Sequence, residues 1–455
     1  MDNELRDMII RNTGEDHARF YVPGHKGRTD LNGGQAPLDV TELYFTDDLN
    51  DPEGPIAGAE RSASELFGSR FTLFTVNGSS AAVMASVMSC AKEGSYVLLP
   101  SDSHLSCYYG AMHASSPVKR LYIKDPVMGI SEQELTAFLE KTDETFSCCV
   151  ITSPTYYGCC AELGKIVSIL HERGIKVIAD ESHGTHLAFT RSPGLSAMAC
   201  GADYVVHSAH KTIGALTQTA MLHVKDPQAD ENLVRLMMRT VQSTSPSFPL
   251  ICSLMDSVER LKTAAGLFDD QEIWYNEILD SISHAKHLEM PDFGGRADRL
   301  KVTVRYSGDM DTFVRILRER KVDEEMILGD LAVFSLGIGT TAEDTAALIG
   351  ALREADERYD AGANHTGGFE TLPVSPQKTG MNEALRRPSD YVLLEECAER
   401  ISSGFVSVYP PGAPVLIPGS LITDEVIGYI KRAHSAHGIY NGCLRVIQRE
   451  KDSER

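Results

Sequence analysis

The chain has 455 residues, of which 42% are hydrophobic and 24% charged, and its formal net charge is −21. This length allows two or three compact units with a sizeable buried core, and the composition is that of an ordinary globular protein, which excludes a disordered or fibrous chain. The negative charge disfavours a nucleic-acid partner, because phosphate binding needs a basic face; it suits small cationic ligands or plain solubility.

The N-terminal stretch "MDNELRDMIIRNTGEDHARF" carries charges throughout and lacks the apolar core of a secretory signal. No segment has the apolar run that a membrane-spanning helix needs. The ten cysteines form no C-x-x-C pair with zinc-type partners, so no metal site is predicted and the thiols are expected to be reduced. We therefore expect a cytoplasmic protein with no membrane partner.

Between about residues 70 and 225, short apolar runs alternate with stretches of helical periodicity. The runs begin at residues 72, 96, 149, 176, 204 and 220, and helix-like segments such as "ELGKIVSILHERG" lie between several of them. This alternation predicts an α/β fold with a doubly wound, mainly parallel sheet covered by helices on both faces.

The pattern changes after about residue 245. A long helix is predicted at "SFPLICSLMDSVERLKTAAGLF", and "LKVTVRYS" and "LAVFSLGIG" predict strands of a smaller α+β domain. Residues 360–390 are poor in apolar residues and predict a surface loop. We expect an N-terminal arm with an acidic loop at 1–58, a large domain at 59–285 and a small C-terminal α+β domain at 286–455.

Ligands of open parallel sheets bind at the carboxyl ends of the strands, so the residues that end each run are candidate site residues. "TVNGSS" ends a strand at Asn77 and Gly78 and starts a helix. Free N–H groups at this helix start, with the hydroxyls of Ser79 and Ser80, would form an anion pocket. Taken alone, such a segment is more often a turn with a helix cap.

Two further strand ends carry ionisable residues. "KVIADESHGTH" places Asp180 at the end of a strand and His183 just beyond it, where the acid could instead cap a turn. "YVVHSAHKTIG" places Ser208, His210 and Lys211 at the end of another strand. A buried lysine needs a purpose, because removing an ammonium group from water is costly.

These three strand ends together match what pyridoxal phosphate requires. The cofactor needs an amine to form an imine, a phosphate cradle and a carboxylate that keeps the pyridinium nitrogen protonated. Lys211, the segment at residues 78–80 and Asp180 would supply them. From the residue patterns alone, both the cofactor site and the structural roles as turns and helix caps remain possible.

A series of motifs runs along most of the chain, with little of it between about residues 265 and 390. They are "FYVPGHKG", "DVTELYFTDDLNDPEGPI", "LFTVNGSS", "SDSHLS", "ITSPTYYG", "ADESHGTH", "HSAHKTIGALTQ", "STSPS", "VSVYPPGAPVLIPG" and "ITDEVI". In this order they resemble the fold-type-I pyridoxal-phosphate decarboxylases of ornithine, lysine and arginine, in particular the short bacterial form. The resemblance implies the fold of the PLP-dependent transferases, that of aspartate aminotransferase. Ser182 departs from it, since the family usually carries alanine there.

The resemblance also implies roles position by position. Lys211 would bind the cofactor covalently, Asp180 would pair with the ring nitrogen and His104 would stack on the ring, and His183 would assist in catalysis. The residues that would surround the cofactor besides these are Gly78, Ser79, Ser80, Thr155, Ser182, Ser208 and His210.

The implied reaction is decarboxylation of a basic amino acid, with arginine slightly ahead of lysine and ornithine. The implied assembly is a homodimer or a higher homo-oligomer with the active site at the subunit interface. Glu42, Asp47 and Asp48 of the acidic loop would receive the distal cation of the substrate, although most carboxylates of this loop could equally cap turns.

Two alternatives stay open. An aminotransferase or amino acid oxidase would keep the cofactor, and Arg445 in "GCLRVIQ" would then clamp the substrate carboxylate, unless it is a surface arginine on an edge strand. A regulator or inactive subunit would bind the cofactor only. The presence of Lys211 and Asp180 argues against that second alternative, since it has no need of an imine-forming lysine.

Overall fold

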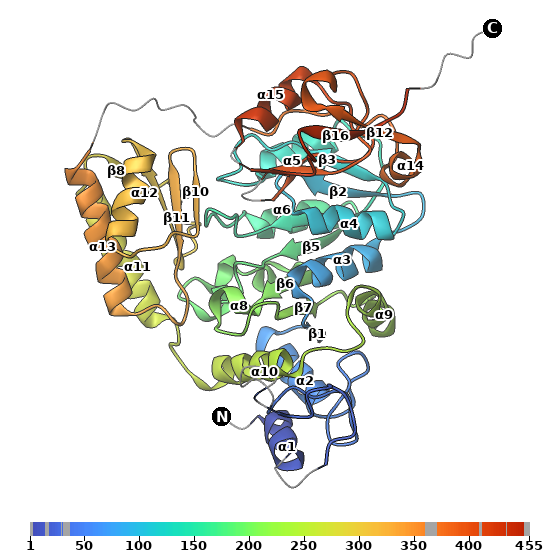
Figure 1. The fold of residues 1–455 in the computed structure, drawn as a ribbon, viewed down its shortest axis with the longest axis vertical. Helices are drawn as coiled ribbons and strands as arrows, with labels where there is room; N and C mark the ends of the chain where they lie inside the picture. The colour runs from blue at the N-terminus through green and yellow to red at the C-terminus, as the bar shows by residue number, and fades with distance from the viewer. Residues whose placement is uncertain are drawn as a thin grey trace.

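A computed structural model gives the structure of residues 3–13, 18–28, 30, 37–359, 371–408, 412–433 and 435–449. Figure 1 shows a central sheet with two smaller bodies, one built by the yellow and orange segments and one by the red segments. The N-terminal helix α1 (Glu4–Asn12) packs on α2 (Pro55–Phe67), and α2 in turn packs on α10 (Phe248–Thr263).

The central sheet has seven strands in the order β1-β7-β6-β5-β4-β2-β3. Neighbouring strands from β6 to β3 are parallel, and β7 runs antiparallel to both β1 and β6. The predicted mainly parallel sheet is therefore confirmed. Only β3 had not been predicted, because its sequence, "VKRL", is half polar, as suits an edge strand. The strands are β1 (Phe71–Thr75), β2 (Tyr96–Pro100), β3 (Val118–Leu121), β4 (Phe146–Thr152), β5 (Lys176–Asp180), β6 (Tyr204–Ser208) and β7 (Ala220–Val224).

Helices cover both faces of this sheet because successive strand residues point to opposite sides. Val150 and Ile178 belong to the apolar cluster under one set of helices, whereas Ile151 and Ala179 belong to the cluster under the other set. The first set is α3 (Gly78–Cys90), α4 (Leu105–His113) and α9 (Glu231–Val241). The second set is α2, α5 (Glu132–Leu139), α6 (Leu163–His171) and α10.

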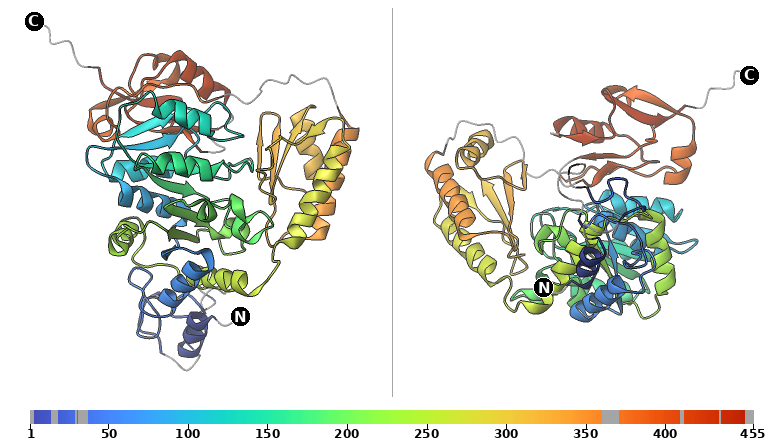
Figure 2. Two further views of the ribbon diagram at one scale, coloured as in Figure 1. Left: turned by 180° about the vertical axis from the view of Figure 1, so that it is seen from behind. Right: turned by 60° about the horizontal axis from the view of Figure 1, so that its bottom comes forward.

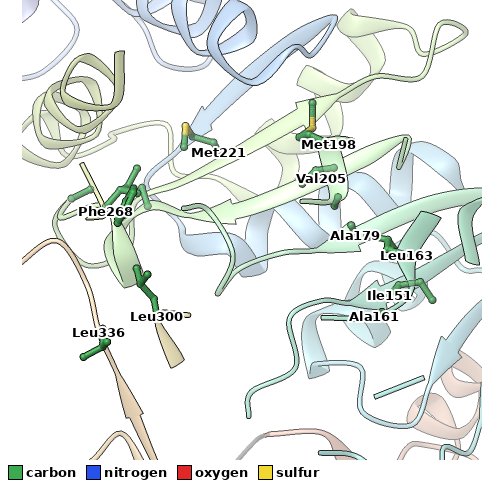
Figure 3. Close-up of a cluster of buried hydrophobic side chains, with 14 of the residues drawn as sticks. Ile151, Ala161, Leu163, Ala179, Met198, Val205, Met221, Phe268, Leu300 and Leu336 are labelled. Atoms are coloured by element: carbon green, nitrogen blue, oxygen red, sulfur yellow. The ribbon is translucent and has the colours of Figure 1, made fainter. Parts of the chain in front are cut away.

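The second cluster extends beyond the sheet. Figure 3 shows strand residues such as Val205 and Met221 in one buried group with Phe268, Leu300 and Leu336. The last two flank strands of the next body, so its core is continuous with that of the central sheet. This continuity holds the second body beside the carboxyl ends of the central strands.

The second body is an antiparallel sheet of four strands in the order β10-β11-β9-β8. Helices α11 (Asp269–Ser283), α12 (Met310–Glu319) and α13 (Ala342–Glu357) pack beside it. Its strands are β8 (Leu288–Glu289), β9 (Lys301–Tyr306), β10 (Met326–Leu328) and β11 (Leu331–Ser335). The predicted strands at "LKVTVRYS" and "LAVFSLGIG" correspond to β9 and β11.

The third body contains two small antiparallel sheets, β12-β16 and β14-β13-β15. Its elements are α14 (Met381–Arg386), β12 (Ser389–Leu393), β13 (Val406–Val408), β14 (Pro414–Leu416), α15 (Asp424–Arg432), β15 (Ala436–His437) and β16 (Cys443–Ile447). Figure 2 shows this body and the second body as separate masses on the central domain. Residues 286–455 thus hold separate sheets, and the predicted division of the chain at residues 58 and 285 stays a prediction.

The prediction of a continuous loop over residues 360–390 is wrong in part. Residues 360–370 lie outside the described residues, but α14 and the start of β12 occupy its second half. β12 forms by pairing with β16, more than fifty positions later in the chain, and its side chains are half-buried or exposed. A short, exposed strand of this kind has little apolar signal, so local composition could not reveal it. No helix within the described ranges is long and apolar enough to span a bilayer.

Candidate active site

The predicted site residues meet at the carboxyl ends of β5 and β6. Asp180 is the last residue of β5 and Ser208 the last of β6, and these two strands are parallel neighbours. By the alternation of side chains, both point to the face that α3 covers. Lys211 follows on the short helix α8 (Ala209–Thr212). The fold therefore brings together the motif that contains Asp180 and the motif that contains Ser208 and Lys211.

This end of the sheet leaves several polar groups available to a ligand. Ser208 Oγ is buried and has no hydrogen-bond partner among the described residues. Gly78 starts α3 with φ of 78°, and the side chain of Asn77 gives this helix no capping hydrogen bond. The N–H of Gly78 donates to the carbonyl oxygen of Gln218 at 2.8 Å, which leaves the amides of Ser79 and Ser80 uncapped among the described residues, at the helix end that attracts anions.

A phosphorylated pyridine cofactor fits these groups. One oxygen of Asp180, Oδ1, accepts hydrogen bonds from the backbone and hydroxyl of Ser182, and the other has no hydrogen bond within the described part of the chain. That free oxygen is what a pyridinium N–H needs, and the Ser208 hydroxyl and α3 amides suit a phosphate. Over the same described residues, no group of three or more His, Cys, Asp or Glu side chains is placed to hold a metal ion.

Lys211 is half-buried, and its Nζ lies 2.9 Å from Nε2 of His183. Burial lowers the pKa of Lys211 below its usual range, while the carboxylates of Asp180 and Glu325 act in the opposite direction. Burial also lowers the pKa of His183 far below its usual range, so this imidazole is neutral at physiological pH. A lysine with a lowered pKa is the form in which an amine can act as a nucleophile.

The other two predicted histidines also lie within electrostatic reach of Lys211. His104 caps α4, with Nδ1 accepting from the backbone N–H of Ser106 at 3.2 Å. Burial lowers its pKa, which Asp180 raises and Lys211 lowers further. His210 lies with Nδ1 3.3 Å from the carbonyl oxygen of Thr219, and its pKa is lowered by burial.

Thr155 is placed differently from these residues. Its hydroxyl donates to the carbonyl oxygen of Val127 at 3.0 Å and accepts from the backbone N–H of Cys159 at 3.1 Å. The side chain thus shapes the turn after β4, and its contact with a cofactor stays a prediction. Ser182, the departure from the family pattern, uses its hydroxyl to bind Asp180.

Most of the hydrogen bonds that the carboxylates of the acidic loop accept come from the loop itself. Asp47 accepts hydrogen bonds from four backbone N–H groups, those of residues 48, 53, 54 and 56, at 2.8 to 3.0 Å. Asp48 accepts from the N–H of Asn50 at 2.8 Å. Glu42 accepts from the hydroxyl of Thr41 at 2.6 Å, and its buried Oε1 has no partner among the described residues. The substrate role of these three residues stays a prediction, and Glu42 has the free oxygen that it would require.

Replacing Asp47 with alanine is expected to lower the free energy of unfolding by about 2 kcal/mol, because it removes the acceptor of the N–H groups at the start of α2. Urea unfolding measures this change. Asp48→Ala, which removes the acceptor of one N–H group, should cost less. A rise in KM for the substrate without loss of stability in Asp47→Ala would contradict this and support a substrate role.

Arg445 is held within the third body. Its guanidinium donates to the hydroxyl of Ser389 at 2.8 Å and to the carbonyl oxygens of Ser403 and Leu385 at 3.2 and 3.3 Å. These bonds tie β16 to β12 and to the end of α14. In this chain the side chain acts as a structural link, which gives no support to a substrate clamp.

Sequence reasoning missed three residues near Lys211, of which Lys301 and Glu325 belong to the second body and Tyr156 to the turn after β4. Lys301 opens β9, is 3% exposed and places its Nζ 3.0 Å from Nδ1 of His183. Tyr156 lies with its ring 5.0 Å from that of His183 and donates its hydroxyl to Glu325 at 2.5 Å. A lysine at the start of an apolar strand was the available signal, but nothing in the sequence pointed to its partner.

A cavity of about 520 Å³ opens beside Lys211. It is lined from the second body by residues 321–323, by the end of β11 and the turn after it, and by the first turns of α13. Ser335, at the end of β11, lines it as well and accepts a hydrogen bond from Lys301 Nζ at 2.7 Å. This volume is in the range of small-molecule sites and gives a ligand room next to the lysine.

Comparison with known proteins places these features in a family. Residues 5–290 match the family described as "Orn/Lys/Arg decarboxylase, major domain", and residues 364–448 match its C-terminal domain. An arginine decarboxylase of Bacillus cereus is 30% identical over 92% of this chain and 96% of its own length.

Two solved structures show the fold. The lysine decarboxylase of Francisella novicida superposes with a TM-score of 0.83 at 19% identity, over 98% of this chain and 81% of that one. A serine palmitoyltransferase from S. paucimobilis with bound PLP has a TM-score of 0.52 at 17% identity, over 66% of this chain and 75% of that one. The predicted fold class is confirmed.

Proposed function

This chain belongs to the Orn/Lys/Arg decarboxylase family, and we propose that it is a pyridoxal-phosphate-dependent decarboxylase of a basic amino acid, with arginine favoured over lysine and ornithine. The products would be the corresponding amine and CO2. The observation that carries the proposal is the meeting of Lys211, Asp180 and Ser208 at one end of the sheet. Among the described residues, one carboxylate oxygen of Asp180 and the hydroxyl of Ser208 have no hydrogen-bond partner. The preference for arginine rests on the names of relatives such as the B. cereus protein.

We propose that residues at the carboxyl ends of β5 and β6 and at the start of α3 hold the cofactor. Lys211 would bind it covalently, Asp180 would accept a hydrogen bond from the ring nitrogen and His104 would stack on the ring. When bound, pyridoxal phosphate supplies an electron sink that accepts the electrons of the broken Cα–carboxylate bond. The residues proposed to contact its phosphate and polar edge are Gly78, Ser79, Ser80, Thr155, Ser182, His183, Ser208 and His210.

The protein itself would control charge and protons during the reaction. Asp180 would keep the ring nitrogen protonated by accepting a hydrogen bond from its N–H group. Loss of CO2 leaves an electron pair at Cα, which takes up one proton to give the amine. We propose that Lys211 or His183 delivers that proton, which the 2.9 Å between Lys211 Nζ and His183 Nε2 supports. Glu42, Asp47 and Asp48 would face the distal cation of the substrate, if a partner subunit brings the acidic loop to the site.

The proposal extends to assembly and location. We propose a homodimer or higher homo-oligomer with active sites at the subunit interface, and a cytoplasmic enzyme. The division into an arm at residues 1–58, a large domain at 59–285 and a C-terminal part at 286–455 belongs to the same proposal.

The deciding experiment offers arginine, lysine and ornithine separately to the purified protein loaded with pyridoxal phosphate. Released CO2 and the amine product are measured, the latter by mass spectrometry. Arginine is expected to give both products in equal amounts and to react faster than lysine or ornithine. A keto acid without CO2 would replace the proposal by transamination or oxidation, and turnover of none of the three would reject it.

A further inference from the structure

The imidazole of His183 lies between two lysine side chains. Its Nε2 is 2.9 Å from Nζ of Lys211, and its Nδ1 is 3.0 Å from Nζ of Lys301. The two lysines come from different bodies, Lys211 from α8 of the central domain and Lys301 from β9 of the second body. A single ring therefore links the proposed cofactor lysine to a second, buried cation.

Proton counting limits the charge that this trio can carry. A neutral imidazole has one N–H donor and one acceptor nitrogen, and an ammonium group can only donate. Two ammonium groups therefore cannot both donate to the same neutral ring, so one lysine must offer a lone pair. The ring itself is neutral, because burial and the neighbouring charge of Lys301 lower its pKa.

The surroundings of the two lysines identify the charged one. Nζ of Lys301 has a second acceptor, the hydroxyl of Ser335 at 2.7 Å, and lies 5.4 Å from the centre of the Tyr156 ring, a cation–π contact. Nζ of Lys211 has only His183 as a hydrogen-bond partner within the described residues. Burial lowers the pKa of both lysines, and that of Lys301 falls to about 8, while nearby carboxylates favour the charge of each. The hydroxyl of Ser335 and the ring of Tyr156 are the contacts that distinguish Lys301 as the charged lysine.

We propose that Lys301 is a positioning residue. Its ammonium group donates a hydrogen bond to Nδ1 of His183 and thereby fixes the ring as the Nε2–H tautomer. The Nε2–H group then faces the Lys211 amine, which is uncharged. An N–H group aimed at Nζ disfavours the ammonium form of Lys211, since two donors would then face each other. The inference deepens the proposed function, because it concerns the protonation of the lysine that would bind the cofactor. Lys301 acts only through His183.

The arrangement should depend on pH through Lys301. The carboxylates of Asp298 and Glu325 favour its charge, whereas burial and Lys211 oppose it, and its pKa is about 8. Below pH 8 the ammonium group of Lys301 donates to Nδ1 of His183, so Nδ1 cannot carry the ring proton. Above pH 8 a neutral Lys301 can accept a hydrogen bond from Nδ1–H, so the tautomer is no longer fixed. Arginine at position 301 would remain charged and extend the Nε2–H form to higher pH.

The first measurement is nitrogen NMR of the cofactor-free protein labelled with ¹⁵N-histidine, which distinguishes protonated from unprotonated ring nitrogens. The signals of residue 183 are assigned with His183→Gln. We expect the Nε2–H tautomer in the wild type at pH 7, its retention in Lys301→Arg and a shift toward Nδ1–H in Lys301→Met. An Nδ1–H ring in the wild type would overturn the proposal without any variant.

The second measurement is the reactivity of Lys211. Reductive methylation with formaldehyde, followed by peptide mass spectrometry, should label Lys211 severalfold more slowly at pH 7 in Lys301→Met, because an amine that is uncharged in the wild type would become largely protonated. Lys301→Arg should restore the rate. Lys119→Met, the same change at a half-buried lysine of β3, should leave it unchanged.

Equal labelling in the wild type and in Lys301→Met would reject the positioning role. Because neither measurement uses the cofactor or the substrate, failure of the decarboxylation assay would leave these results standing. Conversely, CO2 release with an Nδ1–H ring would retain the proposed function and reject this inference.

Discussion

Replacing Lys211 with alanine is expected to lower the rate of CO2 release from the preferred amino acid by about 10⁴-fold or more, because the amine that would bind the cofactor and return a proton to Cα is lost. The visible absorbance of the bound cofactor should change as well, since it would no longer be attached to the chain. Steady-state assays with pyridoxal phosphate in excess, together with absorbance spectra, measure both effects.

Lys119→Ala serves as the matched control for Lys211→Ala. Lys119 is a half-buried lysine on the edge strand β3, where it pairs with Glu144 at 3.1 Å. Its loss should leave turnover within a factor of about two, since exposed ion pairs contribute little. Full turnover in Lys211→Ala would remove this lysine from the mechanism and direct the search to Lys301, the other lysine beside His183.

Changing Asp180 to asparagine is expected to lower kcat by about 10³-fold, because a neutral amide cannot hold the positive charge on the ring nitrogen of the cofactor. Ser182 would still have an oxygen to donate to, so the local structure should persist. The drop should therefore appear in kcat, with a smaller effect on the melting temperature. Steady-state kinetics and thermal unfolding of the loaded protein separate the two quantities.

Asp203→Asn is the matched control for Asp180→Asn. Asp203 is also a buried carboxylate, but it accepts from the backbone N–H of Val177 at 2.7 Å and pairs with His171 at 2.8 Å, near the start of β5 instead of its end. This variant should lose stability and keep kcat. If both variants kept kcat, the carboxylate of Asp180 would have no role in the electron flow.

Much of this protein could be predicted from local sequence. The apolar runs that became β2, β5, β6 and β7 were located almost to the residue, because a strand buried on both faces needs continuous apolar side chains. The strand ends at Asp180 and Lys211 followed from the same pattern, since ionisable residues directly after buried strands mark the ligand edge of a parallel sheet. The family resemblance and the fold class were confirmed.

The tertiary structure decided what depends on contacts between distant segments. Pairing of β12 with β16 created a strand where composition predicted a loop, and four backbone amides occupied Asp47, a proposed substrate residue. Lys301 is the clearest case, because its strand begins about ninety residues after Lys211 and reaches His183 only when the second body packs on the first. Side-chain periodicity reports which face of a strand is buried. Which nitrogen of a buried imidazole carries the proton depends on the groups that folding places on the two sides of the ring.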